Sequence, residues 1–128
     1  MSLIIETNIS IIEELPNGIF KVTIKPGVEV DKKDLEESYR ILLDLTGGKP
    51  SLFLEIFPPD SDATLEAREY FADKQRNKIK KAEAFIVKSL AHRLVAKFHL
   101  NFYKPEHKIK VFSNEADALK WLETFLEE

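Results

Sequence analysis

The chain contains no cysteine, a single tryptophan, a single methionine and only four glycines among its 128 residues. The absence of cysteine excludes a disulfide framework, a thiol nucleophile and a zinc site built on thiolates, and it agrees with a reducing cytoplasm. A secretion signal is missing as well, because the first apolar run, residues 3–5, is interrupted at once by Glu6. We therefore expect a soluble cytoplasmic protein with no transmembrane segment.

An excess of one charge sign is also missing. The chain has 19 Lys and Arg residues against 22 Asp and Glu residues, which gives a net charge of −3, and the two kinds are mostly interspersed. A charge this small and this mixed does not indicate a particular partner, and nothing in it requires nucleic acid.

Catalytic and metal-binding motifs are absent too. There is no nucleophile-elbow serine and no dinucleotide-binding glycine fingerprint. Residues 46–49, Thr-Gly-Gly-Lys, follow a predicted helix and precede a predicted strand, which is the reverse of a phosphate-binding loop. His92 and His99 are seven residues apart on one predicted helix, whereas helices that chelate a metal use a spacing of four. We therefore expect a protein that is not an enzyme, with no catalytic residues, no metal and no cofactor.

What the sequence does contain is a regular succession of strand and helix patterns. Residues 9–15 and 19–25 are short β-rich runs joined by Pro16, Asn17 and Gly18, which predicts an N-terminal hairpin. After it come a helix between Asp31 and Gly47, a strand over residues 51–57, a helix that starts within residues 60–64, a strand over residues 82–88, a helix capped by Ser89, a strand over residues 108–112 and a helix capped by Ser113 or Asn114.

This order, β-β-α-β-α-β-α-β-α, predicts a single α/β domain over residues 1–128. Strands joined by single helices run parallel with right-handed crossovers, so we expect a mixed, mostly parallel five-stranded sheet with four main helices. The strand over residues 51–57 is apolar on both faces, which is typical of a central strand. Because successive crossovers in one direction place their helices on one face, we expect the other face to be covered from elsewhere, by the second subunit of a homodimer.

Candidate site residues gather where the predicted parallel strands end. Ligands of such sheets bind at the carboxyl edge of the strands, beside the helix N-termini. Glu55 is the one carboxylate inside its apolar strand, so it must be paired, protonated or near the strand's open end. In the simplest interpretation, Glu55 lies at the rim of the sheet and bonds to a helix-start amide or to a lysine. The residues that we expect to bind a partner or ligand are Glu55, Phe57, Asp60, Ser61, Asp62, Thr64, Ser89 and His92.

Several of these features together resemble a known family. The element order, the acid within Leu54-Glu55-Ile56, the Asp60-Ser61 pair and the segment 82–121 are similar to the STAS superfamily, and more narrowly to its SpoIIAA-like (STAS/SEC14-type) single-domain bacterial proteins. The resemblance implies a SpoIIAA-like fold. It also implies a non-enzymatic regulatory domain that binds a protein partner and is switched by serine phosphorylation.

Ser61 is the residue on which the resemblance places the phosphorylation. The family's Ser-Ser-Gly sequence at this turn is replaced here by Ser61-Asp62-Ala63. A phosphoryl group on Ser61 would be favoured by the positive end of the following helix and repelled by Asp60 and Asp62. The alternative is that one of these three residues simply caps the helix.

A second interpretation is a small-ligand or lipid-binding domain that associates with a membrane surface. Aromatic side chains would line its cleft, and a basic run would contact an anionic headgroup. The aromatic residues in question are Phe57, Tyr70, Phe98, Phe102 and Tyr103, and the basic run comprises Lys74, Arg76, Lys78, Lys80 and Lys81. An exposed, solvated helix end explains the basic run as well.

Overall fold

The computed structural model describes residues 3–71, 73–89, 92 and 106–126, with the backbone alone of Lys74. One sheet has the strand order β1-β2-β3-β5-β7-β8, and a second, two-stranded sheet consists of β4 and β6. The strands are β1 (Ile4–Glu6), β2 (Ser10–Glu14), β3 (Phe20–Ile24), β4 (Glu29–Val30), β5 (Ser51–Phe57), β6 (Asp62–Ala63), β7 (Lys80–Val87) and β8 (Lys108–Phe112). The helices are α1 (Lys32–Thr46), α2 (Leu65–Tyr70), α3 (Lys74–Asn77) and α5 (Glu115–Glu123).

The large sheet follows the predicted topology. β2 and β3 form the N-terminal hairpin, which is closed by Gly18 at a positive φ of 86°, and β3, β5, β7 and β8 are parallel neighbours. The predicted α/β class and mostly parallel sheet are therefore confirmed. The strand β1, which pairs antiparallel with β2, makes six strands in place of the predicted five. A run of three residues that ends at Glu6 is too short to show a strand pattern, so the sequence alone does not indicate it.

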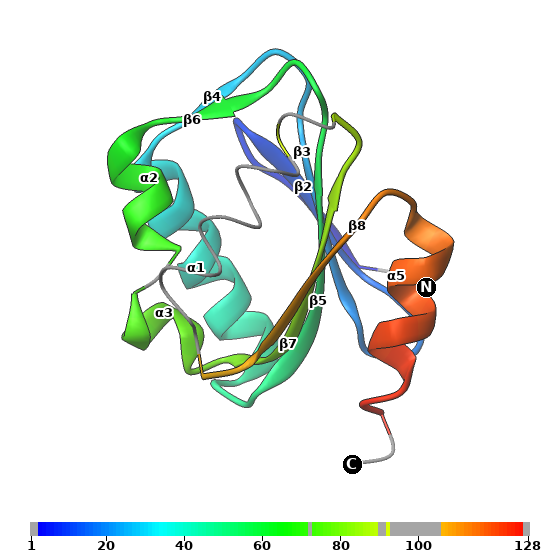
Figure 1. Cartoon of the computed structure of the whole chain (residues 1–128). Coiled ribbons are helices and arrows are strands. Elements are labelled where there is room, and N and C mark those ends of the chain that lie inside the picture. Colours follow the sequence, from blue (N-terminus) through cyan, green and yellow to red (C-terminus); the bar gives the residue numbers. More distant parts are fainter. Residues whose placement is uncertain (1–2, 72, 90–91, 93–105, 127–128) are drawn as a thin grey trace.

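Helices cover both faces of the large sheet, as Figure 1 shows. α1, α2 and α3 lie on one face, and α5 lies on the other, where it packs against β5 and β7. The second face is therefore covered by a helix of the same chain, and the reason for expecting a homodimer no longer holds. The crossover rule constrains helices between parallel strands, but α5 follows the last strand and can fold back on the opposite side.

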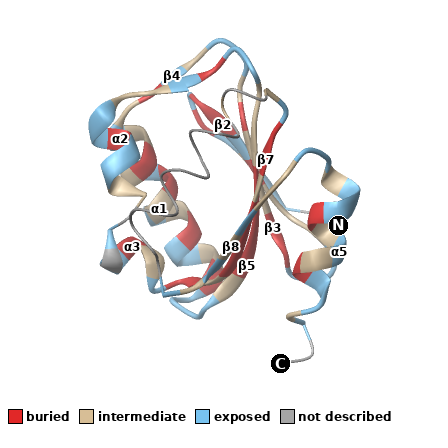
Figure 2. Ribbon diagram, in the orientation of Figure 1, coloured by how far each residue is buried: buried red, intermediate tan, exposed pale blue. Residues whose placement is uncertain are grey.

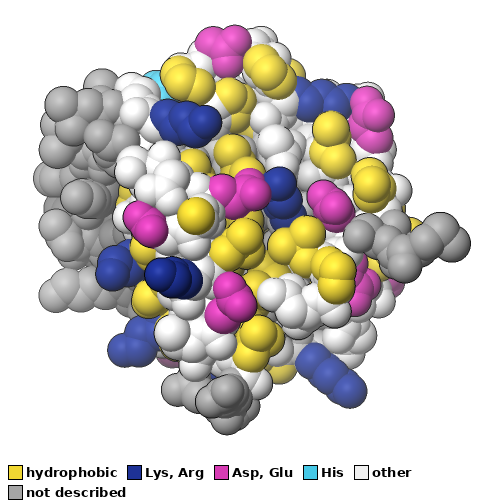
Figure 3. All heavy atoms as spheres, turned by 90° about the vertical axis from the view of Figure 1, so that its right-hand side faces the viewer, with side chains coloured by type: hydrophobic (Ala, Val, Ile, Leu, Met, Phe, Trp, Pro, Cys, Tyr) yellow, Lys and Arg dark blue, Asp and Glu magenta, His cyan; other side chains and the backbone are white. Residues whose placement is uncertain are grey.

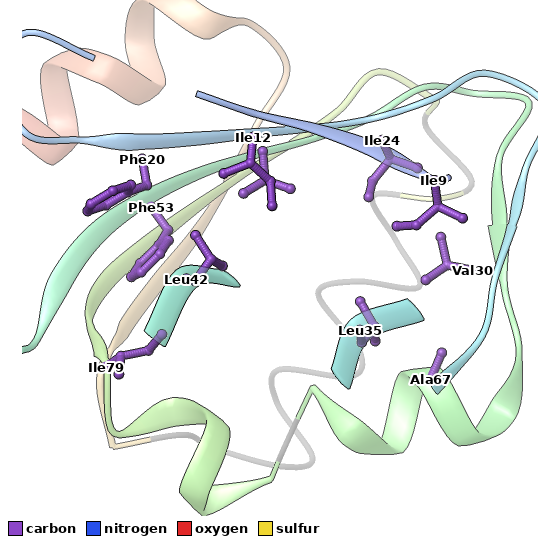
Figure 4. Packing of buried hydrophobic residues seen from close by; sticks show 11 residues of the cluster. Ile9, Ile12, Phe20, Ile24, Val30, Leu35, Leu42, Phe53, Ala67 and Ile79 are labelled. Atoms are coloured by element: carbon purple, nitrogen blue, oxygen red, sulfur yellow. The ribbon is translucent and has the colours of Figure 1, made fainter. Parts of the chain in front are cut away.

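Two hydrophobic cores result, one on each face of the sheet, and the buried residues follow the strands between the helices (Figure 2). On the α1 side, the rings of Phe20 and Phe53 stack with centroids 5.6 Å apart beside Leu42 (Figure 4). On the α5 side, Leu54 and Leu122 belong to the second core. Successive residues of a strand point to opposite faces, so Phe53 and Leu54 of β5 serve different cores.

The loop between β5 and α2, residues 58–64, is tied to the start of α1. Asp31 caps α1 in a capping box with Asp34, and its Oδ1 accepts a hydrogen bond from Oγ1 of Thr64 at 3.2 Å. Thr64 is also the N-cap of α2, because its Oγ1 accepts a hydrogen bond from the N–H of Ala67. β4 and β6 join the same two segments in a parallel ladder. The predicted helix start within residues 60–64 is confirmed, with Thr64 as the capping residue.

Two other predicted elements differ from the structure. The second predicted helix is divided into α2 and α3, and β7 begins two residues earlier than predicted, at Lys80. The predicted helix capped by Ser89 falls outside the described residues apart from His92, whose N–H donates to Oγ of Ser89 at 3.4 Å. Within the described ranges, no helix has both the length and the apolar character needed to cross a bilayer.

Candidate functional site

Five ionisable side chains are buried together on the α1 side of the sheet. They are Glu55 of β5, Arg76 of α3, Lys80 and Glu83 of β7, and His107, which directly precedes β8. Between 1% and 8% of each side chain is exposed. We call these five residues the buried charge cluster. Charged side chains are rarely buried without partners, so their charges have to be compensated locally.

An irregularity at the start of β7 brings two of these charges together. Along a regular strand, residues three apart point to opposite faces, so Lys80 and Glu83 would lie on different sides of the sheet. The register between β5 and β7 shifts where Ser51 and Leu52 pair with Lys80 and Ala82, which leaves one residue of β7 extra. Such a bulge re-aims a side chain, and Nζ of Lys80 lies 3.2 Å from Oε2 of Glu83.

Glu83 is at the centre of the buried charge cluster. Its Oε1 lies 2.6 Å from Nε2 of His107, and its Oε2 lies 3.5 Å from Nη2 of Arg76. Glu55 is the second acid, and its Oε1 lies 3.6 Å from Nη2 of Arg76 and 4.0 Å from Nζ of Lys80. The two acids therefore share the two cations, and Glu83 has the closer contacts.

Aromatic rings and a backbone group hold the two cations in place. Nζ of Lys80 lies 3.7 Å from the centre of the Phe53 ring, and the guanidinium carbon of Arg76 lies 4.9 Å from the centre of the Phe71 ring. Both distances are within the range of cation–π attraction. Nη1 of Arg76 also donates a hydrogen bond to the backbone oxygen of Phe71 at 3.3 Å. The positions of both cations are thus set by packing as well as by the acids.

The two acids of the cluster differ in protonation at neutral pH. Burial, reinforced by the charge of Glu83, raises the pKa of Glu55 from 4.5 to about 8. Burial by itself would raise the pKa of Glu83 too, but the charges of Lys80 and Arg76 outweigh it and hold this pKa well below 4.5. Burial lowers the pKa of Lys80, and the two acids oppose that shift. At pH 7, Glu55 is therefore mainly a neutral acid and Glu83 is a carboxylate.

The proton on Glu55 also completes the hydrogen bonding of the two acids. If both were ionised, Oε2 of Glu55 and Oε2 of Glu83 would be buried without a donor. A protonated Glu55 donates to the ionised Glu83, and this hydrogen bond contributes to their opposite pKa shifts. Nζ of Lys80 lies 3.2 Å from the same carboxylate, so Oγ of Ser38 is the buried side-chain group that still lacks a partner among the described residues.

Ser38 and Lys80 both line a cavity between the sheet and α1. The cavity has a volume of about 20 Å³, which exceeds the roughly 10–15 Å³ that one water molecule needs on the same scale. Glu55 and Arg76 also line it, and the rest of its wall is mostly apolar, with side chains such as Val22, Leu35, Leu42 and Phe57.

The structure confirms that Glu55 is paired and corrects its expected position. Only 8% of its side chain is exposed, so it is not a rim residue bonded to a helix-start amide. Phe57, two residues further along β5, lines the same cavity, and its ring centroid lies 6.1 Å from that of Phe71 and 5.7 Å from that of Phe85. The sequence thus identified two of the residues around the cavity.

The basic run, residues 74–81, does not form one solvated face. Arg76 and Lys80 belong to the buried charge cluster, so the prediction that they contact anionic lipid is wrong. The reason is local: α3 turns Arg76 toward the sheet, and Lys80 is part of β7 rather than of a helix end. Lys78 is exposed and Lys81 is half-buried, whereas the side chain of Lys74 lies outside the described residues.

The surface on the side of α5 does not supply a basic face either. Figure 3 shows basic, acidic and hydrophobic side chains scattered over it, with no large area of one charge sign. The interspersed charges of the sequence are therefore also mixed on this face of the folded chain.

The loop residues predicted to form a docking site are partly used by the fold. Ser61 is 8% exposed, and its Oγ donates a hydrogen bond to the backbone oxygen of Pro58 at 2.9 Å. Phosphorylation of Ser61 would break this bond and require the loop to open. Asp60 and Asp62 are exposed, whereas Thr64 caps α2.

Ser89 and His92 lie at the same edge of the sheet as this loop, because Phe57 at the end of β5 pairs with Val87 at the end of β7. Both side chains are half-buried. In the described part of the chain, neither of them hydrogen-bonds residues 58–64. The convergent charged groups therefore lie on the α1 face of the sheet, and not at the carboxyl edge where the topology predicts a ligand site.

Sequence reasoning misses three residues of this site, Ser38, Glu83 and His107. Glu83 carries the same signal as Glu55, since it is an acid inside an apolar strand, flanked by Ala82 and Ala84. Two such acids on neighbouring strands would have indicated a buried pair. Ser38 falls on the apolar stripe of α1, so the sequence could have indicated it as a polar residue at a core position. No pattern distinguishes His107.

Comparison with known proteins gives a family and a fold. The model of a family described as "Domain of unknown function (DUF7793)" matches residues 13–126. No curated protein matches the chain. The crystal structure of an uncharacterized protein of the DUF3478 family from Shewanella loihica PV-4, with a SpoIIAA-like fold, is similar with a TM-score of 0.60 and 19% sequence identity, over 95% of this chain and 92% of that chain. This similarity confirms the SpoIIAA-like fold that the resemblance implies.

Proposed function

The chain belongs to the DUF7793 family, and we propose that it is a non-enzymatic domain that binds a small polar ligand in the cavity between its sheet and α1. One observation carries this proposal. Oγ of Ser38, a residue that lines the cavity, is buried without a hydrogen-bond partner among the described residues. A buried polar group without a partner costs about 1–3 kcal/mol. A ligand that hydrogen-bonds this hydroxyl recovers part of this free energy when it binds.

Two further observations support binding rather than catalysis. Glu83 and His107 form a carboxylate–imidazole pair with 2.6 Å between Oε1 and Nε2, as in hydrolytic triads, but no serine or threonine of the described residues hydrogen-bonds this imidazole. The chain has no cysteine that could serve instead. Within the described ranges there is also no group of three or more metal-ligating side chains.

Ligand-observed NMR with a panel of small anionic, cationic and neutral molecules tests this proposal. At least one class of compound should bind the wild-type protein and lose binding in the variant Ser38→Val, because the larger side chain occupies part of the cavity. The matched control is Ser113→Val, which changes an exposed serine and should bind as the wild type does. A panel in which no compound separates Ser38→Val from the control would contradict a ligand site in this cavity.

A protein-docking role for the loop 58–64 and the start of α2 is the second candidate, and one specific observation favours it. Leu65 is 65% exposed, and it directly follows a loop in which Pro59, Asp60 and Asp62 are exposed as well. An exposed large apolar side chain within a polar rim is a common feature of interaction surfaces. This role needs no phosphorylation of Ser61.

Affinity purification from the native host compares the wild type with Leu65→Asp. A partner that docks on this surface should be recovered with the wild type and be depleted at least about tenfold with the variant, since one buried apolar anchor contributes on the order of 1–3 kcal/mol. The control is Leu43→Asp, an exposed leucine of α1 outside this loop. Equal recovery with Leu65→Asp and the wild type would count against this surface.

A further inference from the structure

Ser38 is a polar residue on the apolar stripe of α1. It follows Leu35 by three residues and precedes Leu42 by four, and both leucines belong to the core on this side of the sheet (Figure 4). Ser38 is 6% exposed, and its Oγ has no hydrogen-bond partner among the described residues, the carbonyl oxygens of the preceding helical turn included. A buried hydroxyl without a partner is costly, so the cavity that Ser38 lines has to supply one.

The cavity has the size and the polar lining that one water molecule needs. Its volume of about 20 Å³ exceeds the roughly 10–15 Å³ required for one water and is too small for a second. Glu55 and Lys80 of the buried charge cluster line it together with Ser38. A buried water typically makes about three hydrogen bonds, and these side chains match that number. A cavity with an entirely apolar wall would stay dry instead.

Each of these side chains has a hydrogen bond left to make. The ammonium group of Lys80 has three protons, and two of their directions are taken by the Glu83 carboxylate, 3.2 Å from Nζ, and by the Phe53 ring, whose centre lies 3.7 Å from Nζ. The carboxyl group of Glu55 has an acceptor lone pair to spare whether it is neutral or ionised. The hydroxyl of Ser38 can donate or accept. A water molecule also donates and accepts, so it suits all of them, whatever the charge of Glu55.

We propose that one ordered water molecule occupies the cavity and bridges Ser38 of α1 to Glu55 and Lys80 of the buried charge cluster. This water goes beyond the proposed function and does not depend on it, because it belongs to the protein without a ligand. It supplies a polar link between α1 and the sheet, where most of the surrounding side chains are apolar. A ligand that enters the cavity has to displace this water, so the entering group should be of hydroxyl size and repeat its hydrogen bonds.

A high-resolution crystal structure of the full chain without added ligand tests the proposal. It should show a fully occupied water at about 2.5–3.2 Å from Oγ of Ser38 and within the same range of an oxygen of Glu55 or of Nζ of Lys80. Density for a larger molecule in the cavity would overturn the water. A cavity without density would do the same, in particular one in which Oγ of Ser38 bonds a backbone oxygen of its own helix.

Magnetic relaxation dispersion of the water oxygen nuclei tests the proposal in solution, because this measurement counts the water molecules that stay bound for longer than the protein takes to tumble. Ser38→Val should bind one long-lived water fewer than the wild type, since valine fills part of the cavity and offers no hydrogen bond. The matched control, Ser113→Val, changes an exposed serine and should keep the count of the wild type. An equal count in Ser38→Val and the wild type would contradict the water. If Ser38→Val does not fold, the crystal structure of the wild type decides.

The outcomes for the water and for the proposed function are distinguishable. A water at Ser38 together with no binding by any compound of the NMR panel keeps the water and contradicts the ligand site. A compound whose binding is lost in Ser38→Val, in a cavity that holds no water in the free protein, keeps the ligand site and overturns the water.

Discussion

Replacing Glu83 by glutamine should lower the free energy of unfolding by about 3–5 kcal/mol, because it leaves buried cations without their closest counter-ion. Glu83 lies 3.2 Å from Nζ of Lys80 and 3.5 Å from Nη2 of Arg76, and it is 1% exposed. Its carboxylate also accepts the 2.6 Å hydrogen bond from His107. The amide of glutamine has nearly the same volume, so the loss would come from charge and not from a cavity.

The matched variant is Glu55→Gln at pH 5, which should change the free energy of unfolding by less than about 1 kcal/mol. Glu55 is already a neutral acid at this pH, so the amide replaces it without a change in charge. Urea unfolding followed by the fluorescence of Trp121 measures both variants, since this single tryptophan packs against Phe112 and Phe125 with centroids 5.8 and 5.0 Å away. Equal effects of the two substitutions would contradict the assignment of the charge to Glu83.

A double variant keeps this prediction measurable if Glu83→Gln alone unfolds. Adding Lys80→Met to Glu83→Gln removes one of the two uncompensated cations and should restore part of the lost stability. The double variant should therefore be more stable than Glu83→Gln alone. A double variant that is less stable than either single variant would show that the two residues do not compensate each other.

The sequence could predict those parts of the site that leave a pattern in consecutive residues. A continuous run of apolar residues located β5 and singled out Glu55, because burial on both faces leaves a pattern in consecutive residues. The capping residues likewise located the start of α2 within residues 60–64, although several candidates in this segment could not show that Thr64 is the cap. Local patterns were therefore sufficient for the fold and for one acid of the cluster.

The rest of the buried charge cluster depends on contacts between distant segments. Arg76 and Lys80 belong to a run of basic residues with no acid, which by itself is typical of a solvated surface. They are buried because α3 is one turn long and a bulge turns Lys80 toward Glu83. Neither the length of such a short helix nor the position of a bulge leaves a pattern in the sequence.

The cavity could not be predicted for a related reason. It is lined by residues from α1, β3, β5, α3 and β7. Its volume is the space that the side chains of these elements leave unfilled when they pack together, and no single segment specifies it. Ser38 is the nearest approach to a signal, because it is a polar residue on the apolar stripe of α1. A serine at such a position is common where its hydroxyl bonds the preceding helical turn, and only the structure shows that this one has no partner within the described part of the chain.

The stability of the wild type should fall relative to Glu55→Gln as the pH rises from 5 to 9. The pKa of Glu55 is about 8 in the folded chain, above its ordinary value of 4.5. Between these two values the folded chain binds more protons than the unfolded chain, so the contribution of Glu55 is fully present below about pH 4.5 and is lost as the pH rises toward 8. The loss is at most about 1.4 kcal/mol per pH unit for one proton.

The pKa shifts of Glu83 and Lys80 also make the free energy of unfolding depend on pH. The prediction therefore concerns the difference in this free energy between the wild type and Glu55→Gln. The lowered pKa of Glu83 contributes stability that is present above pH 4.5 and lost only on acidification below it. The lowered pKa of Lys80 adds stability as the pH approaches 10.5. Both contributions are common to the wild type and Glu55→Gln, so they largely cancel in the difference and leave the titration of Glu55 itself.

Urea unfolding of both proteins at pH 5, 7 and 8.5 measures this difference. At pH 5 the two should agree within about 1 kcal/mol, and at pH 8.5 Glu55→Gln should be the more stable by roughly 3–5 kcal/mol, because its side chain has no proton to lose. Glu123→Gln, an exposed acid of α5, should show no such change with pH. A constant difference between the wild type and Glu55→Gln from pH 5 to 8.5 would mean that folding does not raise the pKa of Glu55.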